Sequence, residues 1–163
     1  MLGPAVVALA VPLYQHFAEV RRTLLPMACA LLAGVLTAIV SAVGIATLLG
    51  ASVETVASLA PKSVTSPIAM GIAREIGGLP SLTAGFVILT GILGAMLATP
   101  LFNAMGLRDW RARGFGIGIA AHGIGTARAF QVNPLAGTFA AIAMGLNGVA
   151  TAILVPLLVA LFL

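Results

Sequence analysis

The sequence predicts an all-α integral membrane protein, a multi-pass helical bundle in which two helical segments are broken. Of its 163 residues, 61% are hydrophobic and only 7% are charged, and the mean hydropathy is +1.17. Soluble domains carry about a quarter charged residues, so lipid must cover much of this surface. Two short polar patches, PKSVTSP at 61–67 and HGIGTAR at 122–128, interrupt the apolar chain.

Three long stretches satisfy the length that a membrane-crossing helix needs, which is roughly 20 residues. They cover residues 24–50, 81–106 and 134–163, and each is free of charge except at its flanks. The apolar opening at residues 1–14 is shorter than this length and has no basic residues before it. We therefore expect it to be a truncated helix rather than a secretory signal.

The stretches 54–78 and 114–133 do not have the pattern of lipid-facing helices. The first contains Pro61, Lys62 and Pro67, and the second contains five glycines together with His122 and Arg128. Backbone that leaves helical geometry at membrane depth is tolerated only where protein or water satisfies its polar groups. The sequence therefore predicts two broken or re-entrant segments.

Basic residues predict the topology, because Lys and Arg concentrate in short cytoplasmic loops. Five arginines mark two such loops: Arg21, Arg22, Arg108, Arg111 and Arg113. With both loops in the cytoplasm, the two broken segments enter from opposite faces, which is the layout of inverted repeats in secondary transporters. Thr65 and Thr126, 61 residues apart, occupy matching places in this proposed repeat.

The first patch offers donors for a small carboxylate. Pro61 interrupts the helix, and Ser63, Thr65 and Ser66 place hydroxyls beside the cation of Lys62. The start of the helix that follows adds backbone N–H groups and a positive dipole end. In the alternative interpretation, Lys62 extends to the interface and the hydroxyls only cap a helix.

The second patch combines flexible backbone with two ionisable groups. Gly123 and Gly125 permit positive φ or close approach, Thr126 can cap or donate, and Arg128 can bind a carboxylate bidentately. His122 titrates near physiological pH, so it is a candidate for proton coupling. The alternative places Arg128 at a bilayer face and His122 in helix packing.

We expect Lys62 and Arg128 to converge on one anion-binding cavity within the bilayer. Asn147, inside the last apolar stretch, is predicted to hydrogen-bond between helices. Cys29 is the only cysteine, so no disulfide forms within the chain and no metal cluster is predicted. The sparse cations flank apolar runs, which argues against nucleic-acid binding, and no catalytic motif is present. A hydrolase dyad of Ser63 or Ser66 with His122 has no support from spacing, so the chain is not predicted to be an enzyme.

The runs PKSVTSPIAMGIAREIGGLPSLTAGFVILTGILGA, AAHGIGTARAF and AMGLNGVATAILVPLL closely resemble the LrgB/CidB family of bacterial membrane proteins. The resemblance covers essentially the whole chain and indicates a single LrgB-like transmembrane domain over residues 1–163. Family members normally begin with further hydrophobic segments, so the chain resembles the family's C-terminal portion. The motif residues matched here are Lys62, Ser63, Thr65, His122, Gly123, Gly125, Thr126 and Arg128.

The resemblance implies two functions. Members are called holin-like or antiholin-like regulators of murein hydrolase export and lysis, and they work with a small LrgA/CidA-like partner. Related plastid proteins exchange glycolate and glycerate, and bacterial relatives are linked to pyruvate movement. We expect a secondary transporter of small monocarboxylates (pyruvate, glycolate, glycerate or lactate), with the lysis regulator as the alternative. We also expect a homo-oligomer in the bacterial cytoplasmic (inner) membrane, with no cofactor beyond coupling to protons or another cation.

Overall fold

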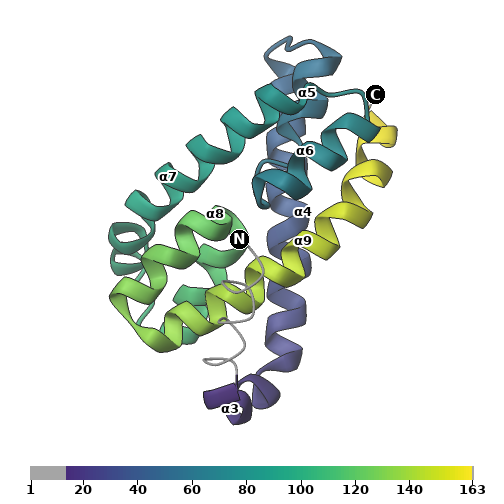
Figure 1. Cartoon of the computed structure of the whole chain (residues 1–163). Helices are drawn as coiled ribbons and strands as arrows, with labels where there is room; N and C mark the ends of the chain where they lie inside the picture. The colour runs from purple at the N-terminus through teal and green to yellow at the C-terminus, as the bar shows by residue number, and fades with distance from the viewer. Residues whose placement is uncertain (1–13, 163) are drawn as a thin grey trace.

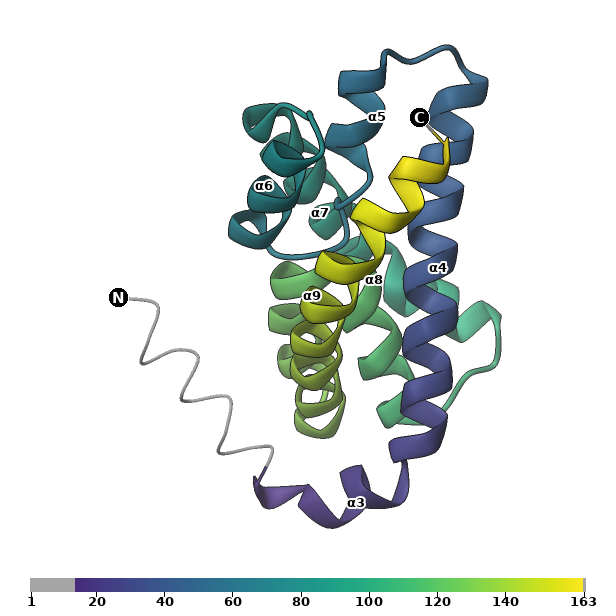
Figure 2. The ribbon, with the colours of Figure 1, turned by 90° about the vertical axis from the view of Figure 1, so that its right-hand side faces the viewer.

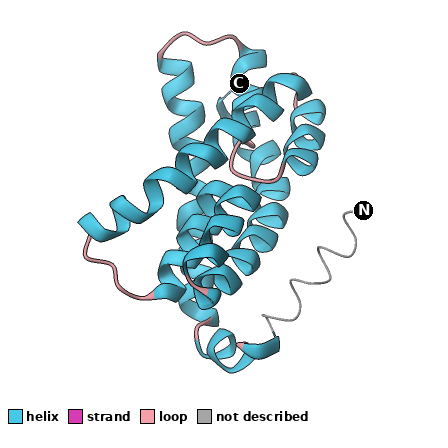
Figure 3. Ribbon diagram, turned by 60° about the vertical axis from the view of Figure 1, so that its left-hand side comes forward, coloured by secondary structure: helices cyan, strands magenta, loops and turns pink. Residues whose placement is uncertain are grey.

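A computed structural model describes residues 14–162, and these residues form helices joined by short loops, with no β-strand among them (Figures 1 and 3). The predicted opening helix at residues 1–14 lies, except for Tyr14, outside the described residues. The helices are α3 (Phe17–Arg22), α4 (Leu24–Leu48), α5 (Val53–Leu59), α6 (Ser66–Glu75), α7 (Pro80–Ala104), α8 (Trp110–Val132) and α9 (Pro134–Phe162).

Three of these helices are long and apolar enough to cross a bilayer, namely Leu24–Leu48, Pro80–Ala104 and Pro134–Ala160. They coincide with the three apolar stretches predicted from the sequence, so the all-helical class and the candidate spans are confirmed. Leucines such as Leu32 of α4 and Leu89 of α7 are exposed on the protein surface. Such side chains suit contact with lipid tails.

Glycines end two of the long helices. Gly50 follows α4 with a φ of 76°, and Gly106 follows α7 with a φ of 66°. The left-handed turn lets the N–H of Ala51 donate to the Ala46 carbonyl (3.0 Å) and that of Leu107 to the Phe102 carbonyl (3.0 Å). Both helices therefore end at these glycines, and each is followed by one of the broken segments.

Helices α5 and α6 form the first broken segment, with a turn at residues 60–65 between them. Thr65 occupies the N-cap of α6 and Pro67 its first turn, as the sequence predicted. The chain then returns to α5, because the Leu79 N–H donates to Ser58 Oγ over 2.7 Å. The segment is a helical hairpin, which we call the first hairpin (residues 53–75), and it lies at the upper end of the molecule in Figures 1 and 2.

Helix α8 is the second broken segment, because the backbone leaves helical geometry at Ala121 and at His122. Beyond this break the chain turns back, so that Gly125 packs against Ile117 and Ala121. We call residues 110–120 the first arm and residues 123–132 the second arm, and together they form the second hairpin. The reversal returns the chain to the end of the molecule at which α8 begins.

Asp109 starts the first arm. Its Oδ1 accepts a hydrogen bond from the backbone N–H of Arg111 over 2.9 Å, and its carboxylate pairs with the Arg111 guanidinium over 2.7 Å. That guanidinium holds the pKa of Asp109 below its usual value. The carboxylate thus stays charged at the N-terminus of α8, where a negative charge is favourable.

Helix α9 packs closely along both arms of α8. A side chain on Gly114 would collide with the backbone of Ala136, and one on Gly118 would collide with Ala140. The matching order of these two contacts shows that α9 runs parallel to the first arm. Small residues allow such close backbone approach between helices in membranes.

Most of the cations lie at one end of the molecule. Thr23, just before α4, lines a cavity together with Asp109 and Arg111, which brings the two arginine-rich segments together. Six of the eight basic residues belong to this end: Arg21, Arg22, Arg108, Arg111, Arg113 and Arg128. The first hairpin, with Arg74, Glu54 and Glu75, lies at the opposite end (Figure 2). This separation agrees with the predicted placement of both arginine-rich loops on one side.

Candidate functional site: a cavity between the two chain breaks

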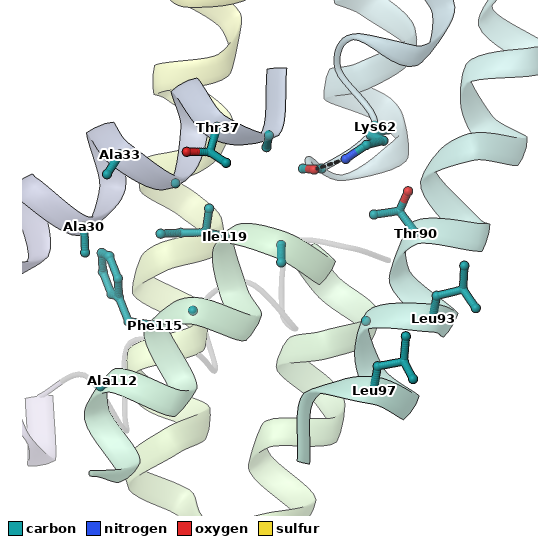
Figure 4. A pocket seen from close by; sticks show the side chains of 16 residues that line it. Ala30, Ala33, Thr37, Lys62, Thr90, Leu93, Leu97, Ala112, Phe115 and Ile119 are labelled. Carbon is teal, nitrogen blue, oxygen red and sulfur yellow. Dashed lines mark hydrogen bonds between the residues drawn. The ribbon is translucent and has the colours of Figure 1, made fainter. Parts of the chain in front are cut away.

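The main cavity lies between α4, α7, the first arm of α8 and the turn of the first hairpin (Figure 4). Its volume is about 740 Å³. Most of the lining side chains are small or apolar, and they are Ala30, Ala33, Gly34, Thr37, Ala38, Lys62, Ser63, Thr90, Leu93, Gly94, Leu97, Ala112, Phe115, Gly116, Ile119 and Ala120. The cavity is large enough for a small organic molecule.

Lys62 carries the only charge among these lining residues. Its Nζ donates a hydrogen bond to Ser63 Oγ over 3.1 Å, and its side chain is partly buried. Within residues 14–162 the one ion pair joins Arg111 and Asp109, so Lys62 has no carboxylate partner there. A cation in an apolar cavity without a counter-charge is a favourable place for an anion.

Two threonines complete the polar lining. Thr37 comes from α4 and Thr90 from α7, and Figure 4 shows Thr90 on the side of the cavity nearest to Lys62. Sequence reasoning missed both residues. Threonines inside apolar helices commonly bond to their own backbone, as Thr83 does to the Leu79 carbonyl, so their spacing gives no signal of a site.

His122 is buried in the second hairpin and does not line the cavity. Its Nε2 lies 2.9 Å from the Val87 carbonyl of α7, so this nitrogen carries a proton and donates. The ring fits because position 91 is glycine, where a Cβ would lie 2.8 Å from His122 Cε1. In this structure His122 therefore packs between helices, as the alternative interpretation of this residue states.

The positive φ of the second hairpin is at His122, with a value of 41°, and not at Gly123 or Gly125. Gly125 instead provides the predicted close approach, against Ile117 and Ala121. The Thr126 hydroxyl donates to the His122 carbonyl over 2.8 Å. Gly123 borders Met144, whose Sδ lies 3.8 Å from an added Cβ. These residues shape the reversal of the chain.

The expectation that Lys62 and Arg128 share one cavity was wrong. Arg128 is exposed, donates to Gln131 Oε1 over 3.4 Å and lines a separate small cavity with Trp110 and Arg113. The physical reason is the reversal at His122, which carries the second arm back to the arginine-rich end. Arg128 therefore lies at the arginine-rich end, apart from Lys62.

Thr65 and Ser66 lie at the start of α6, outside the residues that line the main cavity. The Thr65 side chain makes no capping hydrogen bond, although the residue occupies the N-cap position. Of the residues chosen from the first patch, Lys62 and Ser63 thus face the cavity, whereas Thr65 and Ser66 begin the next helix.

Asn147 of α9 joins the two breaks. Its side chain is 1% exposed, and its Nδ2 donates to the Ser63 carbonyl (2.9 Å) and to the Ile119 carbonyl (3.0 Å). The Thr151 hydroxyl lies 3.2 Å from Asn147 Oδ1 and donates to it. The predicted hydrogen bonding of Asn147 between helices is confirmed.

Three candidate membrane spans and two helical hairpins that meet beside an apolar cavity define a multi-pass helical membrane protein. The chain belongs to the LrgB-like family, whose sequence model matches residues 1–161. This confirms the resemblance noted on the two polar motifs.

Several bacterial proteins are similar along nearly the whole chain. Protein YwbG of Bacillus subtilis is 37% identical over 158 residues, which are 97% of this chain and 70% of that protein. A holin-like protein CidB of Staphylococcus epidermidis is 33% identical over 162 residues, 99% of this chain and 71% of that protein. The holin-like protein CidB of Staphylococcus aureus is 30% identical with the same coverage. No solved structure matches the chain.

Proposed function

We propose that this chain acts in the bacterial cytoplasmic membrane as a holin-like protein that regulates murein hydrolase export and cell lysis. The observation that supports this role is the 33% identity to a holin-like protein CidB over 99% of the chain. The three candidate spans agree with a membrane location. In this role the chain assembles with copies of itself and with a small LrgA/CidA-like membrane protein.

Deletion of the gene in its own host tests this role. We expect the deletion to change the rate of detergent-induced lysis and the murein hydrolase activity released into the medium. Expression of the wild-type chain should restore both quantities. Unchanged lysis and unchanged hydrolase activity in the deletion strain would remove the support for a regulatory role.

A second candidate function is the transport of small monocarboxylates of the pyruvate, glycolate, glycerate or lactate class. One observation favours it: Lys62 lines an apolar cavity, its Nζ donates to the Ser63 hydroxyl, and it forms no ion pair with a carboxylate within residues 14–162. A single cation and an apolar lining suit a molecule with one carboxylate and a short carbon chain. The two functions are compatible, because movement of a metabolic acid can alter lysis indirectly.

The order of elements supports the same candidate. A span, a hairpin, a second span, a second hairpin and a third span follow one another as α4, α5–α6, α7, α8 and α9. We propose that the hairpins are re-entrant from opposite faces and that they form an inverted repeat, as in secondary transporters. Coupling to protons would then involve His122, which bonds α8 to α7.

Uptake into proteoliposomes tests the transport candidate. The full chain should take up labelled pyruvate with saturation, and Lys62→Met should lower uptake at low substrate by about tenfold, the cost of one charged hydrogen bond. Arg74→Met is the matched control, because Arg74 is an exposed cation of α6 outside the cavity. Uptake by the Lys62→Met protein equal to that of the control would rule out the assigned site.

The same preparation separates the two candidates. A holin-like pore releases unrelated neutral solutes without saturation and is insensitive to the charge of Lys62. A carrier retains a trapped neutral dye while it moves the carboxylate.

A further inference from the structure

We infer that Asn147 is a positioning residue that holds the two chain breaks at a fixed separation and so sets the width of the cavity beside Lys62. Asn147 does not line this cavity. The two carbonyls to which it donates belong to Ser63 and Ile119, and both of these residues do line it. One amide thus connects the wall formed by the first hairpin with the wall formed by α8.

The breaks themselves create the need for this amide. In a continuous helix the Ile119 carbonyl would accept from the N–H four residues later, but the backbone at Ala121 and His122 is not helical. The Ser63 carbonyl lies in the turn between α5 and α6. Buried carbonyls need donors, and an asparagine side chain offers two N–H groups. Both are used here, one for each break.

The amide is itself held in one orientation. Its Oδ1 accepts from the Thr151 hydroxyl over 3.2 Å, one turn further along α9. Next to Asn147, Gly148 allows α6 to approach, because an added Cβ would lie 3.0 Å from Ile68 Cδ1. The orientation of the two N–H groups is therefore fixed by the packing and bonding of α9.

Both tethered residues transmit this constraint to the cavity. Lys62 precedes Ser63 in the turn, so a fixed Ser63 carbonyl restricts the backbone that carries the cation. Ile119 packs against α4, where an added Cβ on Gly34 would lie 3.1 Å from Ile119 Cγ2. Without the amide, the first hairpin and α8 would each keep their own fold, but the position of one relative to the other would no longer be fixed.

The role assigned to Asn147 rests on the proposed carboxylate site for its kinetic effect, but its effect on the cavity can be measured without any transport. The reporter is Thr90→Cys in a Cys29→Ala background, since Thr90 lines the cavity and Cys29 is the only native cysteine. A charged, water-soluble thiol reagent is applied to the full chain in membranes, and the labelling rate of the reporter is recorded.

We expect Asn147→Leu, which removes the donors but keeps the branched shape of the side chain, to raise the labelling rate by about tenfold, because two hydrogen bonds no longer oppose opening. Thr151→Val should shift the rate in the same direction by less, and it replaces the first variant in the test if Asn147→Leu prevents folding. Thr138→Val is the matched control, because Thr138 is a buried threonine of α9 whose hydroxyl donates to Pro134 of the same helix.

Two results would overturn the inference. One is a labelling rate in the folded Asn147→Leu protein equal to that of the parent. The other is equal rates for Thr151→Val and Thr138→Val. If the parent shows no carboxylate uptake, the transport proposal fails while the labelling rates still decide the role of Asn147. If uptake is present, Asn147→Leu should raise the KM for pyruvate more than it lowers kcat.

Discussion

At the scale of single residues, His122 shows how one side chain supports a break in a helix. It has a φ of 41°, a conformation in which glycine is far more comfortable than other residues. Its ring bonds to the Val87 carbonyl, and its own carbonyl accepts from Thr126. The cost of the backbone conformation is offset by these contacts between α7 and α8.

This balance predicts the order of stability of two substitutions. His122→Gly loses the bond to Val87 but relieves the backbone, whereas His122→Ala loses the bond and keeps the strain. We expect the His122→Ala protein to be less stable than the His122→Gly protein by about 1 kcal/mol, measured by chemical unfolding in detergent micelles.

The control lies in the second arm, where the backbone is helical. Ala127 is exposed, and we expect the Ala127→Gly protein to be less stable than the parent protein by about 1 kcal/mol. A His122→Ala protein at least as stable as the His122→Gly protein would contradict the account of the break.

At the scale of elements, the sequence predicted the three spans because length and lack of charge decide that question almost alone. It also placed both breaks, because two prolines in seven residues disfavour a continuous helix at 61–67 and the glycines around His122 weaken one. The hairpins at residues 53–75 and within α8 therefore fall where the two polar patches were found.

The sequence allows the second segment to be either broken or re-entrant, and hydropathy does not decide between a bend and a full reversal of the chain. A hydropathy pattern is the same whether the second arm continues or turns back, yet this choice decides the position of Arg128. The reversal depends on contacts distant in sequence, such as His122 with Val87, 35 residues apart. Arg128 was therefore assigned to the wrong cavity, although its motif was recognised.

The polar lining of the cavity was only partly predictable for the same reason. Lys62 and Ser63 were found because a lysine among apolar residues is conspicuous. Thr37 and Thr90 were not found, since single threonines in long apolar helices carry no such signal. The hydrogen bond between Asn147 and Ser63 joins residues 84 positions apart, and only the folded chain reveals it.

At the scale of the whole molecule, the charges are distributed along the long axis in the way that orients membrane proteins. The arginine-rich end contains α3, the α7–α8 loop and Arg128, and the first hairpin lies at the other end (Figure 2). We propose, by the positive-inside rule, that the arginine-rich end faces the cytoplasm. In that orientation the proposed re-entrant hairpins would enter from opposite faces, and the two breaks, which Asn147 joins, would lie between those faces.

The claim central to the transport candidate is our proposal that the cavity between these breaks binds a small carboxylate through Lys62. Protection of a cysteine placed in the cavity tests this claim most directly, with Thr90→Cys in the Cys29→Ala background as reporter. We predict that pyruvate slows thiol labelling with a saturable concentration dependence when Lys62 is present, and that Lys62→Met abolishes the protection. Labelling unaffected by pyruvate, or equal protection without Lys62, would contradict the account.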